Sequence, residues 1–350
     1  MGPTTILICS PFYPAGPIRY LGEAFERTGC HVIRIGASYS DHMGLKWGRD
    51  IELPAIHWEL KRERPQWDLN EFIDWTTKNY QAPDLLIISE ENYQTDIIPT
   101  TKIPSILWSF DGWPNNFERI EMIKPTIGYM NHPYGIRIYP RIEEDHRWRF
   151  MPGAAAPWVH KCLNLERDFD FVLLASMYGK RERICEELGK RGVRTWSGQA
   201  TTPVYVEAHN RALATYHNCN GQQEIKWRFW EVASMGCINI SGDTMLFSRL
   251  GIKPWVHYIP IIERTDENYQ GELWADSEEI FRVIRWLRDH PGKALGISAE
   301  ARVHTLRNHT YLHRARTMLT DLSYIDNRGL IEKTDDAIGL MIKKAGLVPG

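Results

Sequence analysis

The sequence predicts an α/β fold in which two doubly wound parallel-sheet domains follow each other along the chain. Short apolar runs without polar alternation are bounded by Gly and Pro, which is typical of strands buried on both faces of a parallel sheet. Helical repeats separate these runs, and the same alternation starts again after the stretch 151–160. The 350 residues are a natural length for two domains.

The first domain is predicted over residues 1–150. An apolar run at 4–10, a helix at 18–29 and a second apolar run at 31–36 form a strand–helix–strand unit. Apolar residues recur at helical spacing in the middle segment, and the helix ends at a glycine. The further elements expected in this domain are a helix at 69–80 and strands at 84–90, 103–111 and 125–131.

The second domain is predicted over residues 151–322 and repeats this order of elements. Ser277 is expected to cap the helix at 277–291, since serine accepts a hydrogen bond from a free N–H of the first turn. The tail, residues 323–350, has helical apolar spacing and is expected either to cross back to the first domain or to fray. The other predicted elements are strands at 167–176, 193–198 and 237–243, helices at 179–192, 225–236 and 297–322, and a helix followed by a strand within 202–220.

Composition and charge narrow the class of protein. Hydrophobic residues make up 43% and charged residues 25%, so the chain can bury a sizeable core. The net charge of −2 argues against nucleic-acid binding by a whole-chain positive field but leaves room for a local basic groove. Six scattered cysteines without a CxxC pair fit reduced thiols. No apolar stretch reaches the roughly 18 residues of a membrane span, so we expect a cytoplasmic protein without a transmembrane segment.

Several common catalytic motifs are absent from the sequence. Neither GxGxxG nor a GxxxxGKS or GxxxxGKT loop occurs, which argues against a dinucleotide-dependent dehydrogenase and a P-loop enzyme. HExxH and GxSxG are absent as well. The isolated histidines lack a metal-ligand spacing, so we interpret them as structural or solvent-facing and expect no metal. These histidines are His132, His160, His209 and His217.

The segment KWRFWEVASMG predicts a helix with a charged beginning. Lys226 and Arg228 lie at its first turn, where free N–H groups and the helix dipole attract anions. Phosphate is the favoured anion, because arginine offers it a planar fork and lysine a point charge. Glu231 lies on the same face, where a carboxylate suits the hydroxyls of a nucleotide ribose. A packed amphipathic helix with an Arg228–Glu231 surface pair is the competing interpretation.

Three acidic residues follow apolar strands of the first domain. Glu90 and Glu91 come directly after one predicted strand, and Asp111 ends another. A carboxylate at such a strand end could act as general base on an acceptor hydroxyl. Each of them could equally cap the helix that follows.

Five segments of the second half follow one another in a distinctive order: MPGAAAPWVH, DFDFVLLASMYGKRERICEELGKRGVRTWSG, IKWRFWEVASMGCINISGD, ADSEEIFRVIRWLRDHP and RNHTYLHRARTML. This order resembles that of the CgeB-like (spore maturation) glycosyltransferases, which have the GT-B fold. The stretch SILWSFDGW extends the resemblance weakly into the first half. The resemblance implies two Rossmann-like domains facing a cleft, with an acceptor in the first, a nucleoside-diphosphate sugar in the second, and no metal or other cofactor.

The resemblance also implies roles for individual residues. Lys226 and Arg228 become diphosphate ligands and Glu231 becomes the ribose ligand. Gln223 stands where retaining relatives often have a second glutamate, which leaves the stereochemistry open. The remaining donor residues are Ser176, Gly179, Lys180 and Arg181 near the phosphates, Thr195, Trp196 and Gly198 near the base, and Gly242 and Asp243 near the sugar or diphosphate.

The predicted function is transfer of a sugar from a nucleoside-diphosphate donor to an acceptor hydroxyl. An inverting reaction would use Asp111 as base, with Glu90 or Glu91 next, whereas a retaining one needs no protein base. A non-catalytic nucleotide- or glycan-binding module and a sugar-nucleotide epimerase remain as alternatives.

The acceptor is left open by the sequence. The basic and aromatic insert 41–67 contains Trp47 and Arg49 as candidate acceptor-binding residues, beside further tryptophans such as Trp58. A glycan, a small metabolite or DNA with a modified base would each fit such a surface. A solvated helical insert whose tryptophans belong to the core is the competing interpretation.

Overall fold

A computed structural model of the chain describes residues 3–38, 55–60, 68–89, 102–110, 125–131, 147–177, 179–218, 225–266, 273–322 and 328–347. These residues form two compact units. The first contains the described residues up to Pro152 together with those from Tyr311 onward, and the second spans Gly153–Thr310. The second domain predicted from the sequence ends at 322, so its boundary differs from that of the unit.

The first unit is built on a parallel sheet of seven strands in the order β3-β2-β1-β4-β5-β6-β7. Every neighbouring pair in it is parallel. The sheet confirms the strands expected from unbroken apolar runs, whereas β3 and β7 are too short to leave such a run. The strands are β1 (Thr5–Cys9), β2 (His31–Gly36), β3 (Trp58–Glu59), β4 (Leu85–Ser89), β5 (Ser105–Ser109), β6 (Ile127–Met130) and β7 (Trp148–Phe150).

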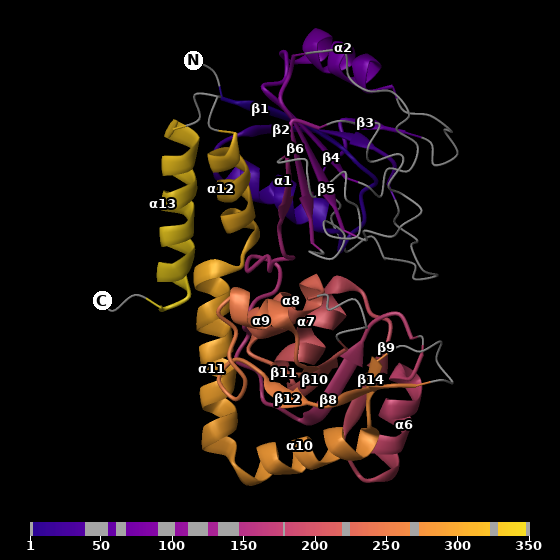
Figure 1. Ribbon diagram of the computed structural model, residues 1–350. Helices are drawn as coiled ribbons and strands as arrows, with labels where there is room; N and C mark the ends of the chain where they lie inside the picture. The colour runs from indigo at the N-terminus through magenta and orange to yellow at the C-terminus, as the bar shows by residue number, and fades with distance from the viewer. Residues whose placement is uncertain are drawn as a thin grey trace. The chain divides into compact units, whose positions relative to one another are not determined.

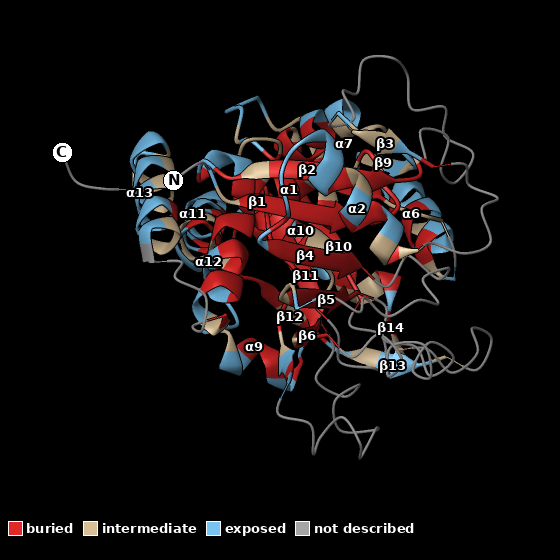
Figure 2. Ribbon diagram, turned by 90° about the horizontal axis from the view of Figure 1, so that it is seen from above, coloured by how far each residue is buried: buried red, intermediate tan, exposed pale blue. Residues whose placement is uncertain are grey.

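Burial of the central strands explains their composition. Every residue of β1, β4 and β5 is buried, and these strands appear red in the centre of the sheet in Figure 2. One face of the sheet packs against Phe72 and Ile73 of helix α2 (Leu69–Asn79). Asp68 caps this helix by accepting a hydrogen bond from the N–H of Asn70 at 2.9 Å. The other face carries helix α1 (Pro17–Arg27), which begins with Pro17 at a position that needs no N–H donor.

Two C-terminal helices, α12 (Tyr311–Asp321) and α13 (Arg328–Lys344), complete the first unit and lie side by side (Figure 1). Helix α12 packs on α1, with the rings of Tyr20 and Tyr311 5.5 Å apart. Arg316 of α12 forms an ion pair with Asp335 of α13. Helix α13 confirms the helical spacing predicted for the tail.

The helix predicted over 297–322 is interrupted. Helix α11 (Pro291–Asn308) ends before α12 begins, because His309 leaves the helical conformation with φ −133° and ψ 49°. The carbonyl of His309 instead accepts a hydrogen bond from the N–H of Ala155 at 2.9 Å. The prediction of one continuous helix was wrong, since a backbone pairing distant in sequence interrupts it.

The second unit contains a parallel sheet of five strands in the order β12-β11-β10-β8-β9. Hydrophobic side chains pack on both of its faces. An antiparallel hairpin, β13 (Glu263–Thr265) with β14 (Leu273–Ala275), follows the sheet in the chain. The sheet strands are β8 (Phe169–Leu174), β9 (Thr195–Gly198), β10 (Ala212–His217), β11 (Ile238–Gly242) and β12 (Ile259–Ile261).

The helices of the second unit follow the predicted order, with one addition. The short helix α9 precedes β12, and neither element was predicted. Asp276, not Ser277, is the N-cap of α10, because its side chain accepts a hydrogen bond from the N–H of Glu278 at 2.9 Å. The helices are α6 (Arg181–Lys190), α7 (Thr202–Asn210), α8 (Trp227–Met235), α9 (Met245–Arg249) and α10 (Ser277–Asp289), besides α11.

The order of the strands creates a switch point between β8 and β10. The chain moves from β8 outward to β9 on one side and then returns to β10 on the other. The loops that leave the carboxyl ends of β8 and β10 therefore diverge, and ligands of open α/β sheets bind in the crevice between such loops. This position defines where a ligand site is expected in the second unit.

Candidate functional site

The N-terminus of helix α8 lies at the carboxyl edge of the second sheet. Lys226 is its N-cap residue and makes no side-chain capping hydrogen bond. The helix sits close to Gly153, where an added Cβ would lie 2.8 Å from the Cα of Trp227. Phe229 and Trp230 are buried, as the amphipathic interpretation of this segment expected. The first turn of α8 thus combines the positive end of the helix dipole with the cations Lys226 and Arg228.

His217, the last residue of β10, lies among these cations. Its side chain is 1% exposed, and neither ring nitrogen has a hydrogen-bond partner among the described residues. The ring meets Phe229 edge to face, with centroids 5.5 Å apart. Burial first, and then the charges of Arg228, Lys226 and Arg181, hold the pKa of this histidine well below 6.5. His217 is therefore a neutral imidazole in a locally positive field.

Arg181 joins the two loops of the switch point. It is 5% exposed, and it donates hydrogen bonds to the carbonyl of Ser176 at 2.7 Å and to Oδ1 of Asn218 at 3.2 Å. The first acceptor follows β8 and the second follows β10, so the guanidinium spans the crevice between them. Lys180, the residue before it, forms an ion pair with Asp266.

Glu231 is buried one turn further along α8. Only 6% of the residue is exposed, Tyr205 donates a hydrogen bond to Oε2 at 3.1 Å, and Nε2 of His160 lies 3.6 Å from Oε1. Burial raises its pKa from 4.5 to about 7 although the Tyr205 hydrogen bond and the charge of Arg228 act in the other direction. An Arg228–Glu231 surface pair is thereby excluded, because the carboxylate is inside the protein.

No sequence pattern identified the histidines of this region as candidate site residues. His160 and His209 are both buried, at 2% and 1% exposure. Nδ1 of His209 lies 2.8 Å from the carbonyl oxygen of Tyr205, while Nε2 has no partner among the described residues. Burial lowers the pKa of His209 to about 4, and the charge of Arg228 adds to this effect. Only the fold shows that His160 lies beside the carboxyl group of Glu231 and that His209 lies within reach of the charge of Arg228.

The other predicted donor residues occupy different parts of the same edge. Gly198 ends β9 with φ +128°, and its carbonyl accepts a hydrogen bond from Ala175 at 2.9 Å. Gly242 ends β11 and Asp243 follows it, where Tyr258 donates a hydrogen bond to Oδ1 of Asp243 at 3.1 Å.

The three remaining predicted positions are not assembled with the cations: two of them pack against other aromatic side chains, and the third lies at the other edge of the sheet. The ring of Trp196 packs on Phe169, with centroids 5.2 Å apart. Thr195 begins β9 and lies at the opposite, amino edge of the sheet, so it is not brought to the other residues. Gly179 has φ +61° and leaves no room for a side chain beside Trp274.

Several predictions fall outside the described residues. They are the candidate bases Glu90, Glu91 and Asp111, the acceptor residues Trp47 and Arg49, and His132 and Gln223. Within the described part of the acceptor insert, Trp58 packs against Phe72 and Trp75, with ring centroids 5.3 Å and 5.2 Å apart. For Trp58 the interpretation as a core residue is the one the structure supports.

The arrangement suits an anionic ligand with hydroxyl groups. Arg181, Lys226 and Arg228 supply positive charge, His217 a neutral N–H, and Glu231 a carboxyl acceptor. In the described ranges no group of three or more His, Cys, Asp or Glu side chains is placed to hold a metal ion. No helix in the same ranges is long and apolar enough to span a membrane.

Comparison with known proteins agrees with this fold. Residues 157–320 match the family model described as glycosyl transferase-like. A glycosyltransferase from Rickettsia africae superimposes with a TM-score of 0.60 at 12% identity, covering 93% of this chain and 99% of that one. The chain has the GT-B fold. No curated protein matches it.

Two further solved structures have a similar fold. Alr3699/HepE from Anabaena, solved with UDP and glucose, has a TM-score of 0.58 at 11% identity and covers 92% of this chain and 100% of that one. A UDP-N-acetylglucosamine 2-epimerase has a TM-score of 0.51 at 11% identity, and the match covers 92% of this chain and 98% of that one. At these identities the likeness establishes the fold. The resemblance to CgeB-like proteins stays a prediction.

Proposed function

We propose that the protein is a glycosyltransferase that uses a nucleoside-diphosphate sugar, and that the donor binds at the switch point of the second unit. The observation that carries this proposal is the buried, neutral His217 among Arg181, Lys226 and Arg228. Three cations and a helix N-terminus converge there without a metal cluster among the described residues. Such a site binds a diphosphate through fixed charges and N–H dipoles.

The same groups would stabilise the departing diphosphate. As the acceptor oxygen bonds to the anomeric carbon, the bond from that carbon to the phosphate oxygen breaks and negative charge grows on the diphosphate. Fixed donors aimed at developing charge lower the barrier without reorganising at the moment of reaction. Arg228 and Lys226 would hold the phosphates, and the reaction would then need no metal. The acceptor proton would pass to Asp111 in an inverting reaction or to the leaving phosphate in a retaining one.

Glu231 would receive the ribose hydroxyls. Its pKa of about 7 means that both forms are populated near neutral pH. The ionised form accepts two hydroxyl hydrogen bonds, and these bonds together with Arg228 favour it over the acid. Nucleotide binding is therefore expected to release a proton in this pH range.

The first test is calorimetric titration with UDP, GDP, ADP, TDP and CDP in EDTA. We expect one nucleotide to bind, and the Anabaena complex makes UDP the first choice. Arg228→Ala should weaken binding by about 10- to 100-fold, which is the range for a lost hydrogen bond to a charged group. Arg183→Ala is the matched control, because this arginine is exposed on α6 and pairs with Glu187. Absence of binding to every nucleotide by folded protein would refute the site.

The second test separates a transferase from a binding module and an epimerase. The protein is incubated with the sugar conjugate of the nucleotide that binds, and the products are analysed by mass spectrometry. Release of the nucleoside diphosphate with a glycosylated product supports transfer. An isomerised sugar nucleotide without acceptor indicates an epimerase, and unchanged ligand with every acceptor tried indicates a binding module.

A further inference from the structure

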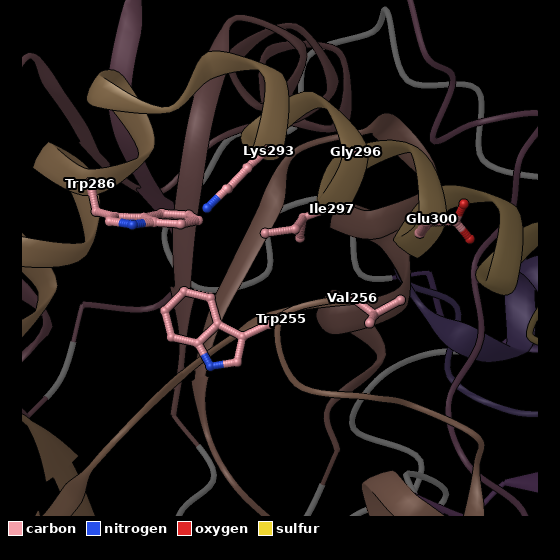
Figure 3. A pocket seen from close by; sticks show the side chains of 7 residues that line it. All are labelled: Trp255, Val256, Trp286, Lys293, Gly296, Ile297 and Glu300. Carbon is pink, nitrogen blue, oxygen red and sulfur yellow. The ribbon is translucent and has the colours of Figure 1, made fainter.

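A pocket lies in the second unit, away from the donor residues. It has a volume of about 500 Å³, within the range of small-molecule sites. The loop between α9 and β12 forms one wall of it and helices α10 and α11 form the other. That loop enters β12 at its amino end, whereas the donor residues follow the carboxyl ends of the strands. The tryptophan pocket, as we name it, is lined by Trp255, Val256, Trp286, Lys293, Gly296, Ile297 and Glu300 (Figure 3).

Trp255 is presented to solvent by a hydrogen-bonded turn. The residue is 52% exposed and has φ +61°, a conformation in which a bulky side chain is a genuine outlier. Its N–H donates to the carbonyl of Tyr258 at 2.8 Å, and the N–H of Lys253 donates to Nδ1 of His257 at 3.0 Å. His257 in turn stacks on His304 of α11, with centroids 4.5 Å apart. Strain held in place by this many contacts is a feature of binding sites, and it pre-organises the exposed indole.

Trp286 forms the second aromatic wall. Its ring meets that of Trp255 at 70° with centroids 5.2 Å apart, so the two indoles make a corner. His290 stacks on Trp286 at 4.8 Å and fixes its orientation. The ammonium of Lys293 lies 5.6 Å from the centroid of Trp286, and in Figure 3 it points toward this ring. Glu300 lies at the far end of the pocket, beyond Ile297 (Figure 3).

The composition of the pocket selects the chemistry of its ligand. The corner of two indoles needs a ligand with an apolar face. An ammonium donor beside that corner and a carboxylate acceptor at the far end of the pocket need a ligand that can both accept and donate hydrogen bonds. A wholly apolar partner would cover Lys293 and Glu300 without pairing them, which is unfavourable. A phosphate would be attracted by the lysine but repelled by the glutamate, so an anionic ligand is a poorer match than a neutral polyol.

We propose that the tryptophan pocket binds a sugar unit of a neutral saccharide chain. One face of a pyranose would stack on Trp255, and its hydroxyls would accept from Lys293 and donate to Glu300. Binding here is a non-covalent event at the amino edge of the sheet, and it does not depend on the transfer reaction proposed for the carboxyl edge. A saccharide could be held at this pocket in a protein that lacks any transferase activity.

Glycine at position 296 offers a direct way to fill the pocket. A Cβ added at Gly296 or at Gly292, one turn earlier on α11, would meet no atom within 4 Å. Both have ordinary helical φ, so a leucine should be accommodated at either without loss of stability. Only Gly296 lines the pocket. Gly296→Leu therefore blocks it, and Gly292→Leu is the matched control.

The experiment is saturation-transfer NMR and calorimetry on the full chain with cellohexaose, chitohexaose and maltohexaose. We expect at least one hexasaccharide to bind saturably, with affinity weakened at least about tenfold by Gly296→Leu and by Trp255→Asn. Asparagine tolerates the positive φ of this position. Gly292→Leu and Arg228→Ala should bind the saccharide as wild type does, and the latter separates this pocket from the donor site.

Three results would overturn the proposal. The first is that none of the three hexasaccharides binds to folded protein. The second is that binding persists unchanged in both pocket variants, which would place the saccharide elsewhere. The third is that Gly296→Leu abolishes binding of a fluorescent apolar dye while no saccharide competes for it, which would make the pocket an apolar docking surface.

Discussion

Replacing Glu231 by glutamine should change how stability depends on pH. The buried carboxyl group has a pKa of about 7 in the folded chain and 4.5 as its ordinary value. A group whose pKa is raised by folding stabilises the protein below its unfolded pKa, and this stabilisation is lost as the pH rises through the folded value. At low pH Glu231 is therefore protonated and does not destabilise the folded chain. At high pH it is a buried charge that does.

The size of the effect follows from the shift. At about 1.36 kcal/mol per pKa unit, the linkage relation makes the contribution of Glu231 fall by about 3 kcal/mol between pH 4.5 and pH 8. Glu231→Gln keeps the shape and the acceptor oxygen but cannot ionise. The free energy of unfolding of the variant minus that of wild type should thus rise by this amount across the interval. At pH 8 the variant should be the more stable protein.

Urea unfolding at pH 4.5, 6 and 8 measures this difference. Glu207→Gln is the control, because Glu207 is exposed on α7 and pairs with Arg211 at the surface. The control should stay within about 0.5 kcal/mol of wild type at each pH. The same Glu231→Gln protein should bind the nucleotide more weakly at pH 8, since a neutral amide accepts ribose hydroxyls less well than a carboxylate.

The reasoning would be refuted by a Glu231→Gln protein that unfolds more easily than wild type at pH 8. A constant difference between variant and wild type at all three pH values would refute it as well. The first result would mean that the ionised carboxylate is stabilised by its neighbours, and the second that it does not titrate in this range. If Glu231→Gln is more stable than wild type at pH 8 but no longer binds the nucleotide, Glu231 serves ligand binding at the expense of stability.

Three further predictions concern stability and binding. Gly36→Ala should lower the free energy of unfolding by at least about 3 kcal/mol in urea melts, since its Cβ would lie 1.8 Å from the carbonyl oxygen of Ser10; Gly339→Ala, with open space around it, should not. A histidine whose pKa is lowered from 6.5 to about 4 by folding makes wild type less stable as the pH falls, so the free energy of unfolding of His209→Leu should rise by about 2 kcal/mol relative to wild type between pH 7 and pH 5. An unchanged difference in urea melts would contradict the burial of His209 as a neutral ring. Nucleotide affinity should be the same in EDTA and in Mg²⁺ if Arg181, Lys226 and Arg228 replace a metal, and at least a tenfold gain with Mg²⁺ would argue otherwise.

The strands could be predicted because their signal is local. An unbroken apolar run such as that of β1 or β4 needs no partner to be read as a buried parallel strand. Short elements such as β3, β7 and β12 escaped prediction, because two or three residues cannot show a period. The cap of α10 was misplaced by one residue, since Asp276 and Ser277 are both good caps and only the hydrogen bond to Glu278 distinguishes them.

By itself the sequence determined the class of the fold, the order of most elements, and the helix whose first turn carries Lys226 and Arg228. These features depend on residues close together in the chain. Tertiary structure alone decided the order of strands, and with it the switch point that brings Arg181 and His217 to this helix. It also decided that Glu231 is buried and that Trp255 and Trp286 form a corner. Contacts between distant segments set burial and charge environment, and no local pattern encodes them.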